Sequence, residues 1–138
     1  MVIPSTRLLR VLLPVALICT VGCPRQDAVW IATGSTPSSL IFVVGERTGV
    51  ESQVRIYSLR IERCAGTDAA QPEQLWAIVE AEGAVSATPS RVRYGVTPSG
   101  FVERVPAKPI GPGCYIARLG GSGTRQFEVT SDSTIRQE

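Results

Sequence analysis

Short apolar stretches of strand length recur through most of this 138-residue chain, and clusters of glycine, proline, serine and threonine separate them. A spacing near ten residues with little helical periodicity favours an antiparallel sandwich or barrel. Strands are expected at residues 28–32, 40–44, 53–63, 75–80, 91–96, 101–105, 114–119 and 125–129. A chain of this length forms one domain. We therefore predict an all-β, antiparallel sandwich of 7–8 short strands.

Residues 72–82 are open to two interpretations. Leu75, Ile78 and Val79 have helical spacing, whereas Trp76 and Ile78 also fit one face of a strand. A glycine soon afterwards would cut a helix short, and the neighbouring segments resemble strands. We therefore favour a strand over a helix.

Turn residues also predict how some strands pair. Two hairpins are expected, 91–96 with 101–105 and 114–119 with 125–129, because proline and glycine lie in the connections. The longest run, 53–63, changes its inward face between Ile56 and Leu59. We expect either a β-bulge near Tyr57 or a strand with apolar surface on both sides.

The N-terminus has the pattern of an export signal. Arg7 and Arg10 precede a run, residues 11–21, that is apolar apart from a proline and a cysteine–threonine pair. A membrane-spanning helix needs about 20 apolar residues, and this run is about half as long. An export signal therefore fits better than a permanent transmembrane anchor.

The end of this signal, Thr20-Val21-Gly22-Cys23, resembles the lipobox of bacterial lipoproteins, although Thr20 stands where leucine is usual. In that family the chain is cut before the cysteine, which carries lipid. The resemblance implies a signal peptide at 1–22, a lipid anchor on Cys23 with a tether at 23–27, and a sandwich domain at 28–138. An ordinary export signal followed by an unmodified cysteine is the alternative.

The lipobox resemblance also implies a location in the cell envelope. Pro24 follows the cysteine, where an aspartate would signal retention at the inner membrane. The implied site is the periplasmic face of the outer membrane if the source has two membranes. Once Arg7 and Arg10 leave with the signal, 12 basic residues balance 12 acidic ones. Membrane affinity would therefore come from the lipid rather than from charge.

Two cysteines, Cys64 and Cys114, remain for the folded part of the chain. An exported protein occupies a compartment that permits disulfides, so we expect these two to pair. Two buried free thiols are the alternative.

Residues around these cysteines resemble the framework of immunoglobulin-like domains. Cys64, Trp76 and Cys114 follow the Cys, Trp, Cys order of that family, in which a disulfide joins the two sheets and the tryptophan packs on it. Tyr115 departs from the pattern, because the family's corner tyrosine lies two residues before the second cysteine. The step 112–115, Pro-Gly-Cys-Tyr, also resembles fibronectin type III and transthyretin-like domains. The resemblance implies an immunoglobulin-like sandwich in the broad sense.

The chain lacks the residues of common catalytic sites. It has no histidine, which excludes Ser/His/Asp and Cys/His arrangements, and it has no Cys-x-x-Cys pair for zinc. Its one lysine, Lys108, lies in a proline-rich connection, and Glu80 and Glu82 suit solvated acids at a strand end. We therefore expect no enzyme activity, no catalytic residues, no metal site and no cofactor.

A binding or structural role remains. Arginines and glutamates alternate on the expected strands, which favours cross-strand ion pairs over a nucleic-acid surface. The candidate binding loop is the segment with Tyr94, Pro98 and Phe101, although both aromatic rings would also suit the core. We predict a non-catalytic interaction domain with a protein partner in the envelope. The alternative is an accessory subunit or inhibitor of an envelope enzyme or secretion assembly.

Overall fold

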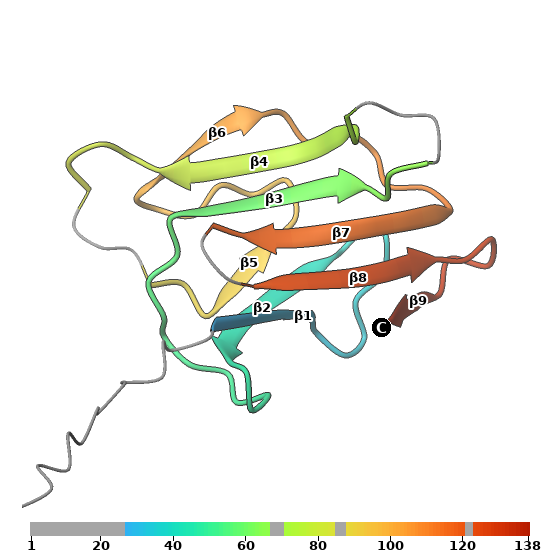
Figure 1. Cartoon of the computed structure of the whole chain (residues 1–138), viewed down its shortest axis with the longest axis horizontal. Coiled ribbons are helices and arrows are strands. Elements are labelled where there is room, and N and C mark those ends of the chain that lie inside the picture. The colour runs from blue at the N-terminus through green and yellow to red at the C-terminus, as the bar shows by residue number, and fades with distance from the viewer. Residues whose placement is uncertain (1–26, 67–70, 85–87, 121–122) are drawn as a thin grey trace, which may run out of the picture.

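Antiparallel strands are the regular elements of the described chain. The computed structural model describes residues 27–66, 71–84, 88–120 and 123–138, so the expected signal peptide and Cys23 lie outside it. The strands are β1 (Asp27–Ile31), β2 (Ile41–Glu46), β3 (Ser58–Arg63), β4 (Gln74–Glu80), β5 (Arg91–Arg93), β6 (Phe101–Val105), β7 (Gly113–Leu119), β8 (Thr124–Val129) and β9 (Ile135–Gln137) (Figure 1). No helix that could cross a bilayer occurs in these ranges. The all-β prediction is confirmed, with nine strands instead of seven or eight.

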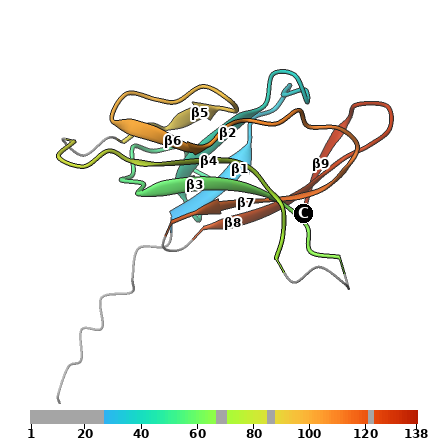
Figure 2. The ribbon, with the colours of Figure 1, turned by 90° about the horizontal axis from the view of Figure 1, so that it is seen from above.

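The strands form two sheets. One has the order β1-β2-β5 and the other has the order β6-β4-β3-β7-β8-β9, with every neighbouring pair antiparallel. Figures 1 and 2 show β2 and β5 in a layer behind β3, β7 and β8. The arrangement is a β-sandwich, as predicted.

The core lies between these layers, because alternate residues of each strand point inward. Phe42 of β2 meets Phe127 of β8 edge to face, with ring centroids 6.0 Å apart. Burying a side chain of this size contributes roughly 1.5–3 kcal/mol. The core also contains Val29, Ile31, Leu40, Val44, Val54, Ile56, Leu59, Ile61, Leu75, Trp76, Ile78, Val92, Phe101, Tyr115, Ala117, Leu119 and Val129.

Residues 74–80 form strand β4, which confirms the strand interpretation of this segment. The longer run at 53–63 is a strand only from Ser58 onward. Val54 and Ile56 are buried in the connection that precedes it, and Tyr57 is exposed. The expected bulge near Tyr57 is wrong, because the two buried sets come from a connection and a strand rather than from one strand.

The hairpin expected between 91–96 and 101–105 is also wrong. Strand β5 pairs with β2, whereas β6 pairs with β4 in the other sheet. A turn in which Val96 N–H donates to the Arg93 carbonyl (3.1 Å) follows β5 at once, and Gly95 takes a positive φ of 74°. This backbone geometry ends the strand and sends the chain across the side of the sandwich. The hairpin of β7 and β8 is confirmed.

Strand β9 was not predicted, and it helps to close the sandwich. The Gln137 side chain accepts from Ile31 N–H (2.7 Å) and donates to the Ile31 carbonyl (2.8 Å). One amide group therefore satisfies both backbone groups of an edge residue in β1, as a neighbouring strand would.

Candidate functional site

The two ends of the sandwich offer different surfaces. We call the end where β1 begins, at Asp27, the entry end. We call the opposite end, where Cys64 follows β3 and Cys114 lies in β7, the disulfide end (Figure 1). Connections of a sandwich gather at its ends and commonly carry recognition, so each end is a candidate site.

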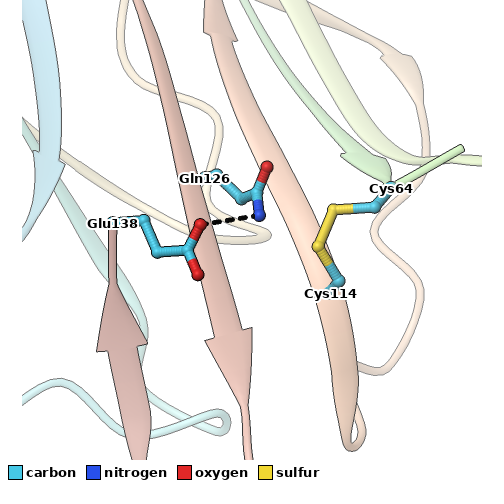
Figure 3. Close-up of a disulfide and its surroundings, with 4 residues drawn as sticks. All are labelled: Cys64, Cys114, Gln126 and Glu138. Atoms are coloured by element: carbon cyan, nitrogen blue, oxygen red, sulfur yellow. Dashed lines mark hydrogen bonds between the residues drawn. A yellow bond between two sulfur atoms is a disulfide. The ribbon is translucent and has the colours of Figure 1, made fainter.

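The disulfide between Cys64 and Cys114 confirms the expected pairing, with Cα atoms 5.3 Å apart. Its place differs from the immunoglobulin framework, because β3 and β7 are neighbours in one sheet. The expected link between the two sheets is therefore wrong. Cys114 lies on the outer face of that sheet, together with Gln126 of β8 (Figure 3). Trp76 points inward with Ile61, so the tryptophan and the disulfide lie on opposite faces.

Tyr115 of β7 holds the connection that precedes this strand. Its hydroxyl donates to the Gly111 carbonyl four residues upstream (2.7 Å), and its ring stacks on Phe127 at 5.4 Å. The Arg63 guanidinium lies 5.3 Å from the ring centroid. A hydrogen bond from a buried tyrosine to the upstream backbone is the feature called a tyrosine corner. Tyr115 makes this bond although it follows the cysteine instead of preceding it.

A second tyrosine binds two connections together at the same end. The Tyr94 hydroxyl donates to the carbonyls of Lys108 (2.7 Å) and Leu75 (3.2 Å). Its ring meets Trp76 edge to face at 5.2 Å. Burial raises the pKa of Tyr94 to about 12. Tyr94 therefore acts as a neutral hydrogen-bond donor at any physiological pH.

Charged side chains surround these tyrosines. The Glu73 carboxylate accepts from Lys108 Nζ (3.0 Å) and from Arg63 Nε (3.2 Å). Lys108 first and then Arg63 lower the pKa of Glu73. Part of the adjoining connection, residues 67–70, lies outside the described residues.

A pocket of about 430 Å³ opens at the disulfide end where three connections meet. Hydroxyl groups and aliphatic side chains line it, with no charged residue among them. Ser133, in the β8–β9 turn, is the one described non-glycine residue with positive φ, at 64°. Backbone geometry of this kind is often found at binding sites. The lining residues are Thr36, Pro37, Ser38, Pro109, Ile110 and Ser133.

The two aromatic rings of the candidate binding loop pack inside the molecule, as the core alternative predicted. Phe101 is buried in β6, and Tyr94 uses its ring and hydroxyl inside the molecule. Pro98 is half-buried, whereas Val96 is exposed. The segment runs along the side of the sandwich between β5 and β6 (Figure 1), so it brings no aromatic cluster to the surface.

A second pocket, of about 450 Å³, opens at the entry end. The start of β1, the turn after β2 and the start of β8 enclose it. The sequence did not indicate this pocket, because its residues come from three distant segments without a shared motif. The lining residues are Asp27, Ala28, Val29, Arg47, Gly123, Thr124 and Arg125.

Arg125 and Asp27 give the entry-end pocket its electrostatic character. Arg125 donates from Nε to the Val29 carbonyl (3.2 Å) and from Nη1 to the Glu138 carbonyl (2.8 Å), which fixes the guanidinium between β1 and the C-terminus. Asp27 Oδ1 is buried without a hydrogen-bond partner. A polar atom in this state costs free energy until a donor reaches it.

The expected cross-strand pairing is met by Arg118 of β7 with Glu62 of β3, whereas two further ion pairs lie within β3 and between β4 and the connection before β3. Glu62 is 5% exposed and accepts from Arg118 Nε (2.8 Å), with Arg60 at 4.0 Å. Glu80 accepts from Arg55 at 3.2 Å. The described ranges hold no group of three metal-ligating side chains.

Family models, curated proteins and solved structures were each compared with this chain, and none of them matches it.

Proposed function

We propose that this chain is an exported, lipid-anchored β-sandwich that presents its disulfide end to a protein partner in the cell envelope. The observation that carries the proposal is the spacing of the domain from the lipobox-like cysteine. Strand β1 begins at Asp27, four positions after Cys23. A lipid on Cys23 would therefore hold the entry end at the membrane and direct the disulfide end away from it.

The disulfide supports export. Disulfides persist in oxidising compartments outside the cytosol, and Cys64 pairs with Cys114 here. The chain also lacks histidine, which favours a binding role over the commonest forms of acid–base catalysis.

Strand order supports an immunoglobulin-like origin for the domain. The sheet β1-β2-β5 follows the A-B-E order of immunoglobulin domains, and β3-β7-β8 follows C-F-G. Strand β4 beside β3 corresponds to C′ of variable-type domains, and β6 and β9 extend the sheet at its two edges. The tyrosine corner at Tyr115 agrees with this assignment.

Intact mass after detergent extraction tests the anchor. We expect a species that starts at Cys23 and carries acyl mass, and we expect globomycin to block its processing. Cys23→Ser should abolish acylation, whereas the matched control Cys19→Ser should leave it unchanged. A species that starts at Cys23 without acyl mass would overturn the proposal.

Site-specific photocrosslinking in intact cells tests the partner. A photoreactive residue at Ser38, in the disulfide-end pocket, should capture an envelope protein, whereas one at exposed Arg104 on β6 should not. One dominant partner in near-equal amount would favour the accessory-subunit alternative. Equal capture at both positions would contradict recognition at the disulfide end.

A further inference from the structure

We propose that the entry-end pocket binds the phosphoethanolamine headgroup of a phospholipid in the membrane that holds the anchor. This inference rests on the proposed lipid anchor at Cys23 and assigns a ligand to the surface beside it. Position, cationic side chains and an unpartnered carboxylate oxygen support it.

The position follows from chain length. Asp27 lines the pocket and lies four residues after Cys23, and four extended residues span at most about 14 Å. An acylated Cys23 would thus keep the pocket beside the headgroup layer of the bilayer. Headgroups then act at a high effective concentration, so even a weak individual site is occupied.

The cationic side chains suit a phosphate group. Arg47 and Arg125 both line the pocket, and a guanidinium carries five N–H donors that suit phosphate oxygens. Hydrogen bonds to Val29 and Glu138 hold Arg125 in place through Nε and Nη1. The Thr124 hydroxyl adds a further potential donor to the lining.

The carboxylate distinguishes among phosphate-bearing headgroups. Asp27 Oδ1 is buried without a hydrogen-bond partner, and a primary ammonium would supply the opposite charge and N–H donors beside this side chain. Phosphoethanolamine carries phosphate and primary ammonium together. Phosphoglycerol has no ammonium group. Phosphocholine has a quaternary ammonium, which carries no N–H donors. A pocket with both signs of charge therefore favours the ethanolamine headgroup.

Headgroup titration of the full acylated protein tests the inference. The protein is held in uncharged maltoside micelles, and the amide signals of Gly123 and Thr124 are followed by NMR. Added phosphatidylethanolamine should shift both signals, and phosphatidylglycerol and phosphatidylcholine should shift them less. Equal shifts with inorganic phosphate would show a site for free phosphate and overturn the headgroup assignment. The absence of any shift would also overturn it.

Two pairs of variants separate the contributions. Asp27→Asn should remove the preference for phosphatidylethanolamine over phosphatidylcholine, whereas Glu128→Gln, an exposed control, should keep it. Arg47→Gln should weaken binding about fivefold, which corresponds to the loss of one typical hydrogen bond to the phosphate. Arg93→Gln, on exposed β5, should not weaken it. Unchanged preference in Asp27→Asn would contradict the proposed role of the carboxylate.

The proposed headgroup site and the proposed lipid anchor can be overturned independently of each other. Acyl mass is measured on the same sample, and the pocket signals are read whether or not Cys23 is modified. A shift in unacylated protein would keep the headgroup site and overturn the anchor. Acylated protein without a shift would keep the anchor and overturn the site.

Discussion

The disulfide end of the sandwich is held by a covalent bond, by two tyrosine hydroxyls and by the ion pairs of Glu73, whereas the entry end has ion pairs but no disulfide among the described residues. Cys64 and Cys114 join neighbouring strands at the disulfide end. Tyr115 and Tyr94 donate hydrogen bonds to backbone carbonyls of the connections there. The disulfide and the two tyrosine hydrogen bonds are little affected by salt, because they involve neutral groups. The exposed ion pairs of Glu73 at the same end are screened by salt.

At the entry end, Arg91 pairs with Glu51 at 2.9 Å and Arg55 pairs with Glu80 at 3.2 Å. Such pairs contribute little to stability, because water and salt screen exposed charges. The covalent bond and the tyrosine hydrogen bonds preorganise the disulfide end, which agrees with the partner surface that we propose there.

Removing the disulfide should produce the largest effect and bring the two ends closer in stability. The bond closes a loop with a sequence separation of 50, so Cys64→Ala with Cys114→Ala should cost about 4 kcal/mol in the chain-entropy model. Urea unfolding at neutral pH measures this change in the free energy of unfolding.

A reducing agent provides the matched control for that measurement. It should destabilise the unmodified protein by a similar amount and leave the double variant unchanged. A loss below about 1 kcal/mol would contradict the view that the disulfide dominates its end of the domain.

Removing one hydroxyl at the disulfide end should have the next largest effect. Tyr115→Phe deletes the hydrogen bond to the Gly111 carbonyl but keeps the ring on Phe127. We expect a loss of about 1 kcal/mol. Tyr57→Phe is the matched control, because Tyr57 is 55% exposed and its loss should leave stability unchanged. Equal effects of the two variants would show that the Tyr115 bond is not structural.

Local sequence patterns predicted the strands better than their partners. The β7–β8 hairpin was predictable because its turn and both strands are adjacent in sequence. Strands β5 and β6 are also close in sequence, yet they belong to different sheets. A turn directly after Arg93 and the positive φ of Gly95 separate the two strands. These are backbone conformations that cannot be predicted from the alternation of apolar and polar residues.

The candidate sites were even harder to predict from local sequence patterns than the strand partners. The pairing of Cys64 with Cys114 followed from counting cysteines, but its place within one sheet depends on strand order. The entry-end pocket joins Asp27, Arg47 and Arg125, which are far apart in sequence and share no motif. A site of this kind becomes visible only when the register of the strands is known.

Alkaline pH should weaken the disulfide end through Tyr94. Burial raises the pKa of this phenol to about 12 in the folded protein, above the ordinary value of 10.0. The Tyr94 phenol therefore ionises at a lower pH in the unfolded chain than in the folded protein. The free energy of unfolding falls as pH rises from about 10 toward 12. Unfolding by urea between pH 8 and 11 should show this fall, and Tyr94→Phe should reduce it. A matching reduction in Tyr57→Phe would contradict the assignment to Tyr94.

Replacing Glu51 by Gln should have the smallest effect and should be confined to the entry end. The hydrogen bond from Arg91 lowers the pKa of Glu51 below its ordinary value of 4.5. A carboxylate of this kind stabilises the fold above that value, and its contribution is lost as pH falls through the lower folded pKa. The difference in urea midpoint between the unmodified protein and Glu51→Gln should be present at pH 7, shrink below about pH 4.5, and close in about 1 M salt. Glu128→Gln, at an exposed position of β8, should leave the urea midpoint at pH 7 unchanged. A difference that persists in high salt would mean that Glu51 contributes through packing, and the contrast between the two ends would then lose its electrostatic basis.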